Sequence, residues 1–595
     1  MDFWKRVINL AYMITDGRPS VTTINNFLGL NMNKTGETQL KLGEASMMQN
    51  FRITKDYKLE KMYGYQELFK PDARIRANWV GKLNGTEMNI YVAGGKVYKG
   101  GATPEELGTL TDDDTTIFEF NKILYFLNGH EYKSYDGTTF GDVTGYIPKI
   151  KISCTPAGVG EDYEPINMLS AYRRVSFSGN GTSTQYTLPE KDVSNATAKV
   201  NGVTTSITLN SSTGVATFST APATGTDNVE ITYMKNNVTT DTEICKNKYE
   251  QSYGLATDTR IFVYGNEDAK NRVYFSDLGD GVPNPAYFPA NNFIDIGSSN
   301  TAVTDISRQY DRLIISKENE AYYATYDAIT DTTGDKIISF PTYPLNTSHG
   351  MVAKGQGQLL DNYVTTIDAS GIIQWVNTQS KDERNAKIIS EKVADWLQAH
   401  DVTKAITMDY QEEKEYWVAI GNEILVYNYA NGTFYIHVLP DNVRTLTTYD
   451  GSIYMGTDTS IMNFRYNLTT YNGTTIDAEW QSGFYDFEYE YRRKTMRILW
   501  ITVKPQEKTY MRVNYISDRN EGLNPKEVSN QTFSYEFWNY ADFTYNANGR
   551  IKPFRIKLKA KKFAFLKLII KNDKPDYRLI VDTISIQKAY GGNVK

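Results

Sequence analysis

Short runs of alternating apolar and polar residues, separated by turns rich in Gly, Asn and Asp, fill most of the 595-residue chain. Such alternation places successive side chains on opposite faces of a strand. Helical spacing is scarce, and one helix is predicted, over residues 389–400, with Ser390 as its cap. Its apolar residues Val393, Trp396 and Leu397 fall on one face. The pattern predicts an all-β protein.

A figure of strand, tight turn and second strand recurs seven times, at intervals of roughly 35–50 residues once one insertion is set aside. The copies begin at Asn89, Ile123, Ile261, Arg312, Asn362, Tyr416 and Ser452. One four-stranded blade cannot bury both of its faces alone, so such blades stack in a ring. We therefore predict a β-propeller of about seven blades over residues 71–150 and 251–475. The alternative is a set of unrelated hairpins in a sandwich.

Residues 151–250 interrupt these repeats with a Ser-, Thr-, Asn- and Gly-rich sequence that contains tight turns such as Asn201-Gly202. We expect an inserted small β-sandwich, carried on a propeller loop. Cys154 and Cys245 bracket the insertion and either lie on neighbouring strands at its base or are unrelated. We favour two buried free thiols, as is usual for a protein made in a reducing cytoplasm.

Residues 476–595 carry longer alternating strands, which predict a C-terminal, jelly-roll-like β domain. This part is basic, with 22 Lys and Arg against 14 Asp and Glu, although the whole chain has a net charge of −6. In the segment RIKPFRIKLKAKKF, cations alternate with apolar residues, so a strand would place them on opposite faces. The exposed face is either solvated or contacts an acidic neighbour such as another subunit. The candidate subunit or neighbour contacts are Lys557, Lys559, Lys561 and Lys562.

Enzyme signatures are scarce. Two cysteines and four scattered histidines argue against a zinc site, and no nucleotide-binding loop or hydrolase motif is present. The acidic strings at 111–116 and 277–281 are interpreted as turns. A propeller glycosidase needs a pair of carboxylates. The candidates, Asp382-Glu383, Glu412-Glu413 and Asp409, cannot be distinguished from ordinary surface charges. We predict no enzyme, and no catalytic, cofactor-binding or metal-binding residues.

The segment Phe27–Phe69 resembles the opening of bacteriophage tail proteins of the tail-nozzle and packaged-DNA-stabilisation group, the tail tubular protein B-like proteins of short-tailed phages. The residues that carry this resemblance are Leu40, Gly43, Glu44, Ala45, Asn50, Phe51 and Gly64. Other stretches of the propeller and the C-terminal FAFLKLIIKND are similar to the same group. None of them is a motif with a defined chemistry.

The resemblance implies a structural virion protein in the tail, synthesised in the host cytoplasm. It would form a homo-oligomeric ring of about six copies below the portal and adaptor. That ring would close the DNA channel, retain the packaged genome and open for ejection. The partners implied are the portal or adaptor, tail-fibre or other tail proteins, transient genomic dsDNA and, as a further option, the host envelope. No cofactor comes with the family.

The charge distribution is compatible with a channel. An acidic propeller repels DNA phosphates, and a channel that must release a genome quickly avoids adding salt-sensitive phosphate contacts. The N-terminal arm, residues 1–70, is expected either to reach a neighbouring subunit or to form the first propeller strands. Two other functions stay open, a receptor-binding tail protein that uses the inserted domain and a propeller glycan hydrolase.

Overall fold

The computed structural model describes residues 19–32, 38–239, 242–255, 257–330, 336–376, 385–504, 506–519, 522, 525–531 and 551–594. Strands make up most of it. It divides into two compact units. Unit 1 comprises Met1–Val80, Thr365–Trp375 and Lys387–Lys595, and unit 2 comprises Gly81–Val364 and Val376–Ala386.

Seven four-stranded antiparallel arrays follow one another along the described chain. The first three contain β7 (Ile75–Leu83), β8 (Thr86–Ala93), β9 (Lys96–Lys99) and β10 (Glu105–Thr109); β11 (Thr116–Phe120), β12 (Ile123–Leu127), β13 (Tyr132–Tyr135) and β14 (Phe140–Asp142); and β24 (Tyr249–Leu255), β25 (Asp258–Tyr264), β26 (Arg272–Phe275) and β29 (Phe293–Asp295).

The next two contain β30 (Val303–Gln309), β31 (Arg312–Lys317), β32 (Ala321–Thr325) and β35 (Thr342–Asn346); and β36 (Gln358–Leu360), β37 (Tyr363–Asp368), β38 (Gly371–Trp375) and β39 (Ala386–Ile388). The sixth contains β40 (Ile406–Tyr410), β41 (Glu415–Ile420), β42 (Glu423–Asn428) and β43 (Thr433–Val438), and the seventh contains β44 (Thr445–Tyr449), β45 (Ser452–Gly456), β46 (Ile461–Phe464) and β6 (Tyr65–Phe69).

These arrays are the blades of the predicted propeller, because each of the seven hairpins recognised in the sequence lies within one of them. The first strands of several successive blades contact each other, as β24 contacts β30 and β40 contacts β44. This is the relation of inner strands around a propeller axis. The last blade takes its outer strand from the N-terminal region, since Tyr65 of β6 pairs with Phe464 of β46.

The insertion forms a small sandwich of two sheets within unit 2. One sheet contains β16 (Glu161–Asp162), β15 (Lys149–Cys154), β17 (Tyr172–Gly179), β23 (Gly225–Lys235), β19 (Val193–Val200) and β20 (Val203–Thr205), and the other contains β18 (Gln185–Thr187), β22 (Val215–Phe218) and β21 (Ile207–Asn210). A core of its own, with Phe177, Tyr186 and Tyr233, is completely buried. Neither cysteine is in a disulfide. Cys154 lies inside this core, and Cys245 is half-buried at the end of α2 (Thr242–Cys245).

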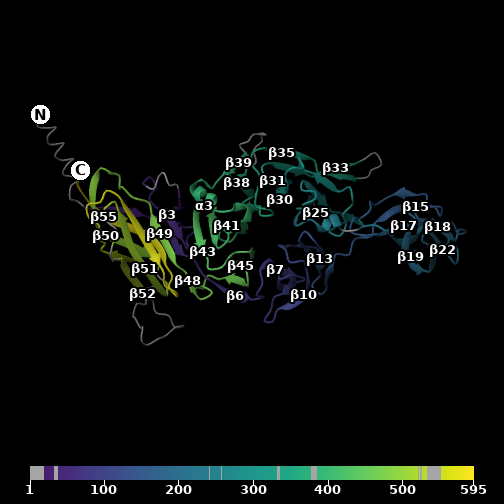
Figure 1. Ribbon diagram of the computed structural model, residues 1–595, viewed down its shortest axis with the longest axis horizontal. Helices are drawn as coiled ribbons and strands as arrows, with labels where there is room; N and C mark the ends of the chain where they lie inside the picture. The colour runs from purple at the N-terminus through teal and green to yellow at the C-terminus, as the bar shows by residue number, and fades with distance from the viewer. Residues whose placement is uncertain are drawn as a thin grey trace. The chain divides into compact units, whose positions relative to one another are not determined.

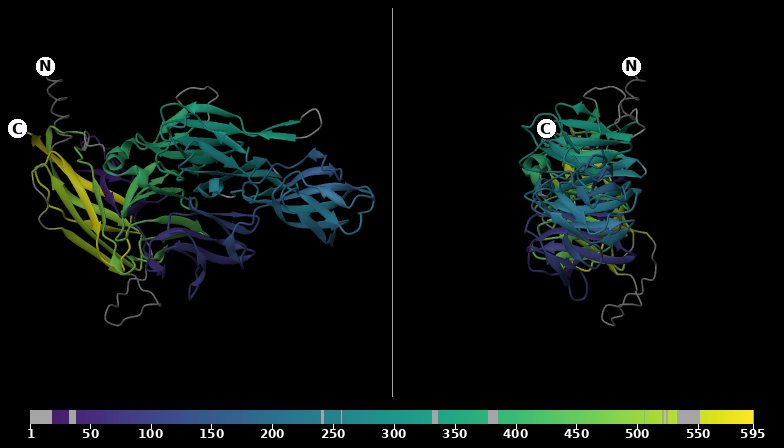
Figure 2. Two further views of the ribbon diagram at one scale, coloured as in Figure 1. Left: turned by 45° about the vertical axis from the view of Figure 1, so that its right-hand side comes forward. Right: turned by 90° about the vertical axis from the view of Figure 1, so that its right-hand side faces the viewer.

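The C-terminal domain is a second sandwich (Figures 1 and 2). One sheet contains β4 (Phe51–Ile53), β5 (Leu59–Lys61), β55 (Ile580–Asn593), β50 (Arg492–Val503) and β53 (Lys552–Ile556), with β1 (Pro19–Ile24) also on β55. The other continues from β43 through β3 (Glu44–Gln49), β49 (Ala478–Ser482), β54 (Leu566–Asn572), β51 (Lys508–Ser517) and β52 (Lys526–Gln531), with β2 (Gly29–Leu30) on β3. Buried side chains alternate along both sheets, among them Leu499 and Ile501 of β50 and Met511 and Val513 of β51. The predicted fold class, a propeller with an inserted sandwich and a C-terminal β domain, is confirmed.

The described part of the N-terminal segment is shared between the C-terminal domain and the propeller. Within residues 19–61, β1 and β5 pair with β55, and β3 pairs with β49. β6 enters the last propeller blade, and β3 extends the sheet of the sixth blade through β43. The reason is that the C-terminal sheets leave edges open, and strands from the beginning of the chain complete them.

The predicted helix is shorter than expected. Its first turn is the 3₁₀ turn Glu391–Val393, which continues as α3 (Ala394–Ala399). Val393, Trp396 and Leu397 are buried, as the spacing predicted. Ser390 makes no side-chain cap, because its hydroxyl accepts instead from the backbone N–H of Ile372, at 2.9 Å. Among the described residues, no helix has the length and apolar character that crossing a membrane requires.

Candidate functional site

The four predicted contact lysines lie at the edge of the C-terminal sandwich and are all exposed. We call Lys557, Lys559, Lys561 and Lys562 the lysine row. The residues between them, Leu558 and Ala560, are buried. β53 itself ends at Ile556, earlier than predicted. Beyond it the segment stays attached to β50 through the bond from Met496 N–H to Ala560 C=O (3.0 Å), and through the bridge between Lys494 and Phe563.

Two of the carboxylates that the sequence offered as glycosidase candidates form side-chain contacts within the fold. Asp409 accepts from the Tyr429 hydroxyl at 2.9 Å, and Glu413 pairs with Arg52 at 3.6 Å. The Glu412 backbone carbonyl accepts from Lys55. Asp382 and Glu383 lie outside the described residues.

The two acidic strings interpreted as turns are local structure with ion pairs. Asp113 accepts from Lys248 at 2.9 Å. Asp280 lies in the turn between β27 (Asp277–Gly279) and β28 (Val282–Asn284) and pairs with Arg174 at 3.3 Å. Within the part of the chain that the structure describes, no group of three or more His, Cys, Asp or Glu side chains is arranged to hold a metal.

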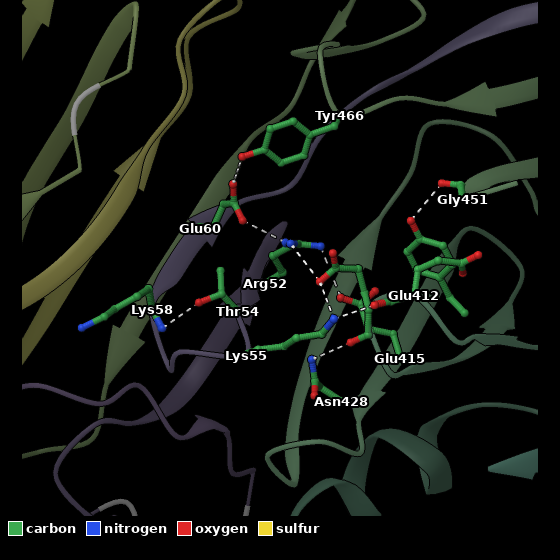
Figure 3. A network of polar contacts seen from close by, with 12 residues as sticks. Arg52, Thr54, Lys55, Lys58, Glu60, Glu412, Glu415, Asn428, Gly451 and Tyr466 are labelled. Atoms are coloured by element: carbon green, nitrogen blue, oxygen red, sulfur yellow. Dashed lines mark hydrogen bonds and ion pairs between the residues drawn. The ribbon is translucent and has the colours of Figure 1, made fainter. Parts of the chain in front are cut away.

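A buried charge network joins the N-terminal segment to the propeller blades of unit 1 (Figure 3). Arg52 of β4 donates to Glu60 of β5 at 3.0 Å and lies 3.4 Å from Glu415 of β41. Their exposed fractions are 6%, 6% and 1%. Burial alone would lower the pKa of Arg52, but the Glu415 and Glu60 carboxylates outweigh it and hold the pKa above its ordinary value. Arg52 is therefore a permanent cation that binds two segments far apart in the chain.

The carboxylates of Glu415 and Glu60 also accept hydrogen bonds from donors other than Arg52. Glu415 accepts from the Tyr435 hydroxyl at 2.7 Å and from the Trp417 indole N–H at 2.9 Å. Glu60 accepts from the Tyr466 hydroxyl at 2.8 Å. Buried ionic groups remain tolerable when additional hydrogen bonds satisfy them, and their directionality fixes how segments meet. The network is suited to holding geometry rather than to exchanging protons with a substrate.

Asn50, two residues before Arg52, makes a second joint. It is 2% exposed and has a positive φ of 54°. Its amide donates to the Asp477 carbonyl and accepts from the Val438 backbone N–H, both at 2.8 Å. Its own N–H donates to the Ile436 carbonyl at 2.8 Å. One residue thus links β43 of the sixth blade to the chain that enters β49 of the sandwich.

Other residues of the string Phe27–Phe69 have equally structural roles. Glu44 is 2% exposed, pairs with Lys392 at 2.9 Å and accepts from the Lys41 N–H at 3.0 Å. A Cβ on Gly43 would lie 2.2 Å from the Asn26 carbonyl oxygen, and one on Gly64 would lie 1.9 Å from that of Thr470. The segment Phe27–Phe69, which carried the sequence resemblance, therefore connects the sandwich to the last two blades. We call this segment and its contacts the junction.

Sequence reasoning missed Arg52, Glu60 and Glu415. The available signal was a charged residue inside the apolar run of β4, in which Phe51 and Ile53 are also buried. A cavity of about 10 Å³ next to the network is lined by Glu60, Tyr63, Tyr466 and Arg578, among others. That is room for about one water molecule. A sugar ring cannot enter it.

No family model matches the chain, and no curated protein matches its sequence. Three solved structures show partial likeness. BamB from Moraxella catarrhalis has 9% identity and a TM-score of 0.29 over 66% of this chain and 96% of that one. AztD from Citrobacter koseri has 10% identity and a TM-score of 0.27 over 66% and 88%. An exo-β-1,3-galactanase from Phanerochaete chrysosporium has 8% identity and a TM-score of 0.17 over 80% and 96%. At these TM-scores, the fold assignment rests on the sheet order described above.

Proposed function

We propose that this chain is a structural subunit of a short-tailed phage tail, in a nozzle ring that closes the DNA channel, retains the genome and opens for ejection. One observation carries the proposal. The segment that resembles the opening of such tail proteins is the junction, and its buried groups Glu44, Asn50 and Arg52 join a sandwich to propeller blades. A subunit that bears the load of a pressurised genome needs joints of this kind.

The chemistry of the described residues supports a mechanical role. The glycosidase candidates Asp409 and Glu413 are committed to internal hydrogen bonds and ion pairs. The junction uses a permanent guanidinium and satisfied carboxylates, which stabilise one arrangement of segments. We therefore propose no catalytic residues for the glycan hydrolase alternative.

The test is to produce phage particles that lack the protein. The proposal predicts that heads package DNA but lose it, so the genome becomes accessible to added nuclease. Restoring the intact gene in trans should return nuclease-resistant particles. Stable, DNA-filled particles without the protein would contradict the proposal.

The receptor-binding alternative is favoured by one feature, the independent core of the inserted sandwich. Replacing residues 149–235 by a short linker separates the two functions. Loss of adsorption with full DNA retention would assign the insertion to host recognition. Unchanged adsorption would remove that alternative.

A further inference from the structure

The lysine row is a preorganised surface. Ile556, Leu558, Ala560 and Phe563 are buried beneath it, so the backbone is held in place while the lysines project outward. Residues two apart on an extended chain are separated by about 6.6–6.8 Å. Lys557, Lys559 and Lys561 alternate with the buried Leu558 and Ala560, so the three lysines lie on the exposed side of the segment. Arg555, two residues earlier, is exposed as well.

This row differs from cations elsewhere in the molecule. Lys96 pairs with Glu106 at 2.7 Å, Lys248 with Asp113 at 2.9 Å, and Arg272 with Asp295 at 2.8 Å. Among the described residues, no carboxylate lies within ion-pair distance of any lysine of the row. Four neighbouring like charges repel one another, so an anionic surface from another molecule would relieve that repulsion.

The chain itself carries a matching anionic surface. Residues 101–148, which we call the acidic span, hold nine Asp and Glu against two Lys. The span includes β10, β11 and β14, and many of its carboxylates are exposed. The exposed carboxylates include Glu105, Asp112, Asp114 and Glu119. Glu106 and Asp142 are exposed too, but they pair with Lys96 and Lys133 of the same chain.

We propose that the lysine row of one copy docks on the acidic span of a second copy of this chain. The inference rests on the proposed function, because a ring requires contacts between copies. The two surfaces differ, so the contact is heterologous, the type that closes into a ring when the rotation between copies divides a full turn. Charge complementarity favours a protein surface over nucleic acid, because the chain as a whole is acidic, with a net charge of −6.

The experiment measures self-association of the full chain by sedimentation velocity, at about 50 mM and about 500 mM NaCl, where the screening length falls roughly threefold. The row variant is Lys557→Glu, Lys559→Glu, Lys561→Glu and Lys562→Glu together. The span variant is Glu105→Lys, Asp112→Lys, Asp114→Lys and Glu119→Lys together. We expect each variant alone to associate at least about tenfold more weakly than the wild type, with most of the salt dependence gone.

Mixing the two variants supplies the decisive arm. The row variant retains an unaltered acidic span, and the span variant retains an unaltered lysine row, so mixed pairs should form with wild-type affinity. A matched control carries the same charge change at exposed lysines elsewhere, Lys191→Glu, Lys199→Glu, Lys270→Glu and Lys387→Glu. This control should associate more strongly than the row variant.

Several results would overturn the inference. They are a wild type that stays monomeric at low salt over micromolar concentrations, a row variant that associates normally, a mixture that does not recover, or a control as weak as the row variant. Salt-sensitive binding of a random duplex DNA that only the row variant loses, with self-association intact, would reassign the row to nucleic acid. The nuclease test of particles measures the proposed function independently, so failure of the docking contact and failure of the proposed function can be distinguished.

Discussion

The guanidinium of Arg52 lies 3.4 Å from the carboxylate of Glu415, and both side chains are almost completely buried. The two residues are far apart in the sequence and lie on β4 of the sandwich and β41 of a propeller blade. Unit 1 therefore contains an internal joint at which the Arg52 guanidinium pairs with carboxylates of both the sandwich and the blade.

Breaking this pair should strongly destabilise unit 1. Glu415→Gln leaves a buried cation with less compensation, and removing one partner of a buried pair costs about 3–5 kcal/mol in the free energy of unfolding. Glu413→Gln is the matched control, since its side chain is 33% exposed and should change that energy by less than about 1 kcal/mol. Urea unfolding, followed by tryptophan fluorescence, measures both. Equal effects would contradict the account of the joint.

Asn50 should show a backbone requirement in addition to its hydrogen bonds. Asn50→Ala removes the bonds to Asp477 and Val438 and forces a Cβ-bearing residue without a polar side chain into the left-handed region. Asn50→Gly removes the same bonds but accepts a positive φ freely. We expect the Gly variant to be more stable than the Ala variant by about 1 kcal/mol in urea unfolding. An Ala variant as stable as the Gly variant would show that φ does not matter there.

Gly64 should not tolerate a side chain. A Cβ there would lie 1.9 Å from the Thr470 carbonyl oxygen, immediately before β6, which completes the last blade. Gly64→Ala is therefore expected to lower the thermal unfolding midpoint by several degrees or to abolish soluble expression. Gly592→Ala is the control, because nothing lies within 4 Å of its Cβ position. Normal stability of the Gly64 variant would place β6 differently.

The propeller could be predicted from the sequence because each blade is local. Hairpins such as Ile123–Phe140 carry their own alternation and turn residues, so their pattern survives without knowledge of the rest of the chain. The alternation within the lysine row was readable for the same reason. Alternation alone did not show where the strand would end, because that depends on pairing with β50.

The junction could not be predicted in the same way. β1 pairs with β55, and the hydroxyls of Thr23 and Ser585 meet at 3.1 Å across 562 residues. Nothing in a local pattern specifies a partner at that distance. Likewise, in the sequence Arg52 is indistinguishable from an exposed polar residue of a strand. Only the folded chain places Glu415 and Glu60 beside it. The resemblance in Phe27–Phe69 marked the right segment but did not reveal its role.

Asp305 of unit 2 should give the stability of the chain an identifiable pH dependence. It is 3% exposed, and burial raises its pKa to about 6, although the Ser307 hydroxyl and the Gly357 N–H oppose that shift. Because the pKa of Asp305 is higher in the folded chain than in the unfolded chain, the protonated carboxyl stabilises the fold fully below its ordinary pKa. This stabilisation is lost as pH rises through 6. Asp305→Asn should therefore gain stability relative to the wild type between pH 4 and pH 7.

The measurement for Asp305 is the difference in thermal midpoint between variant and wild type across that pH range. Asp311→Asn serves as the control, because Asp311 is exposed in the neighbouring turn. A constant difference for the Asp305 variant would mean that this carboxyl is charged in the folded chain throughout the range.

The most direct test of the central claim is the number of copies of this protein in a purified virion. Quantitative mass spectrometry, with the portal protein as internal standard, provides it. A nozzle ring predicts about six copies in every DNA-filled particle. Absence from particles would contradict the structural role altogether, and about three copies or a large excess would contradict the ring.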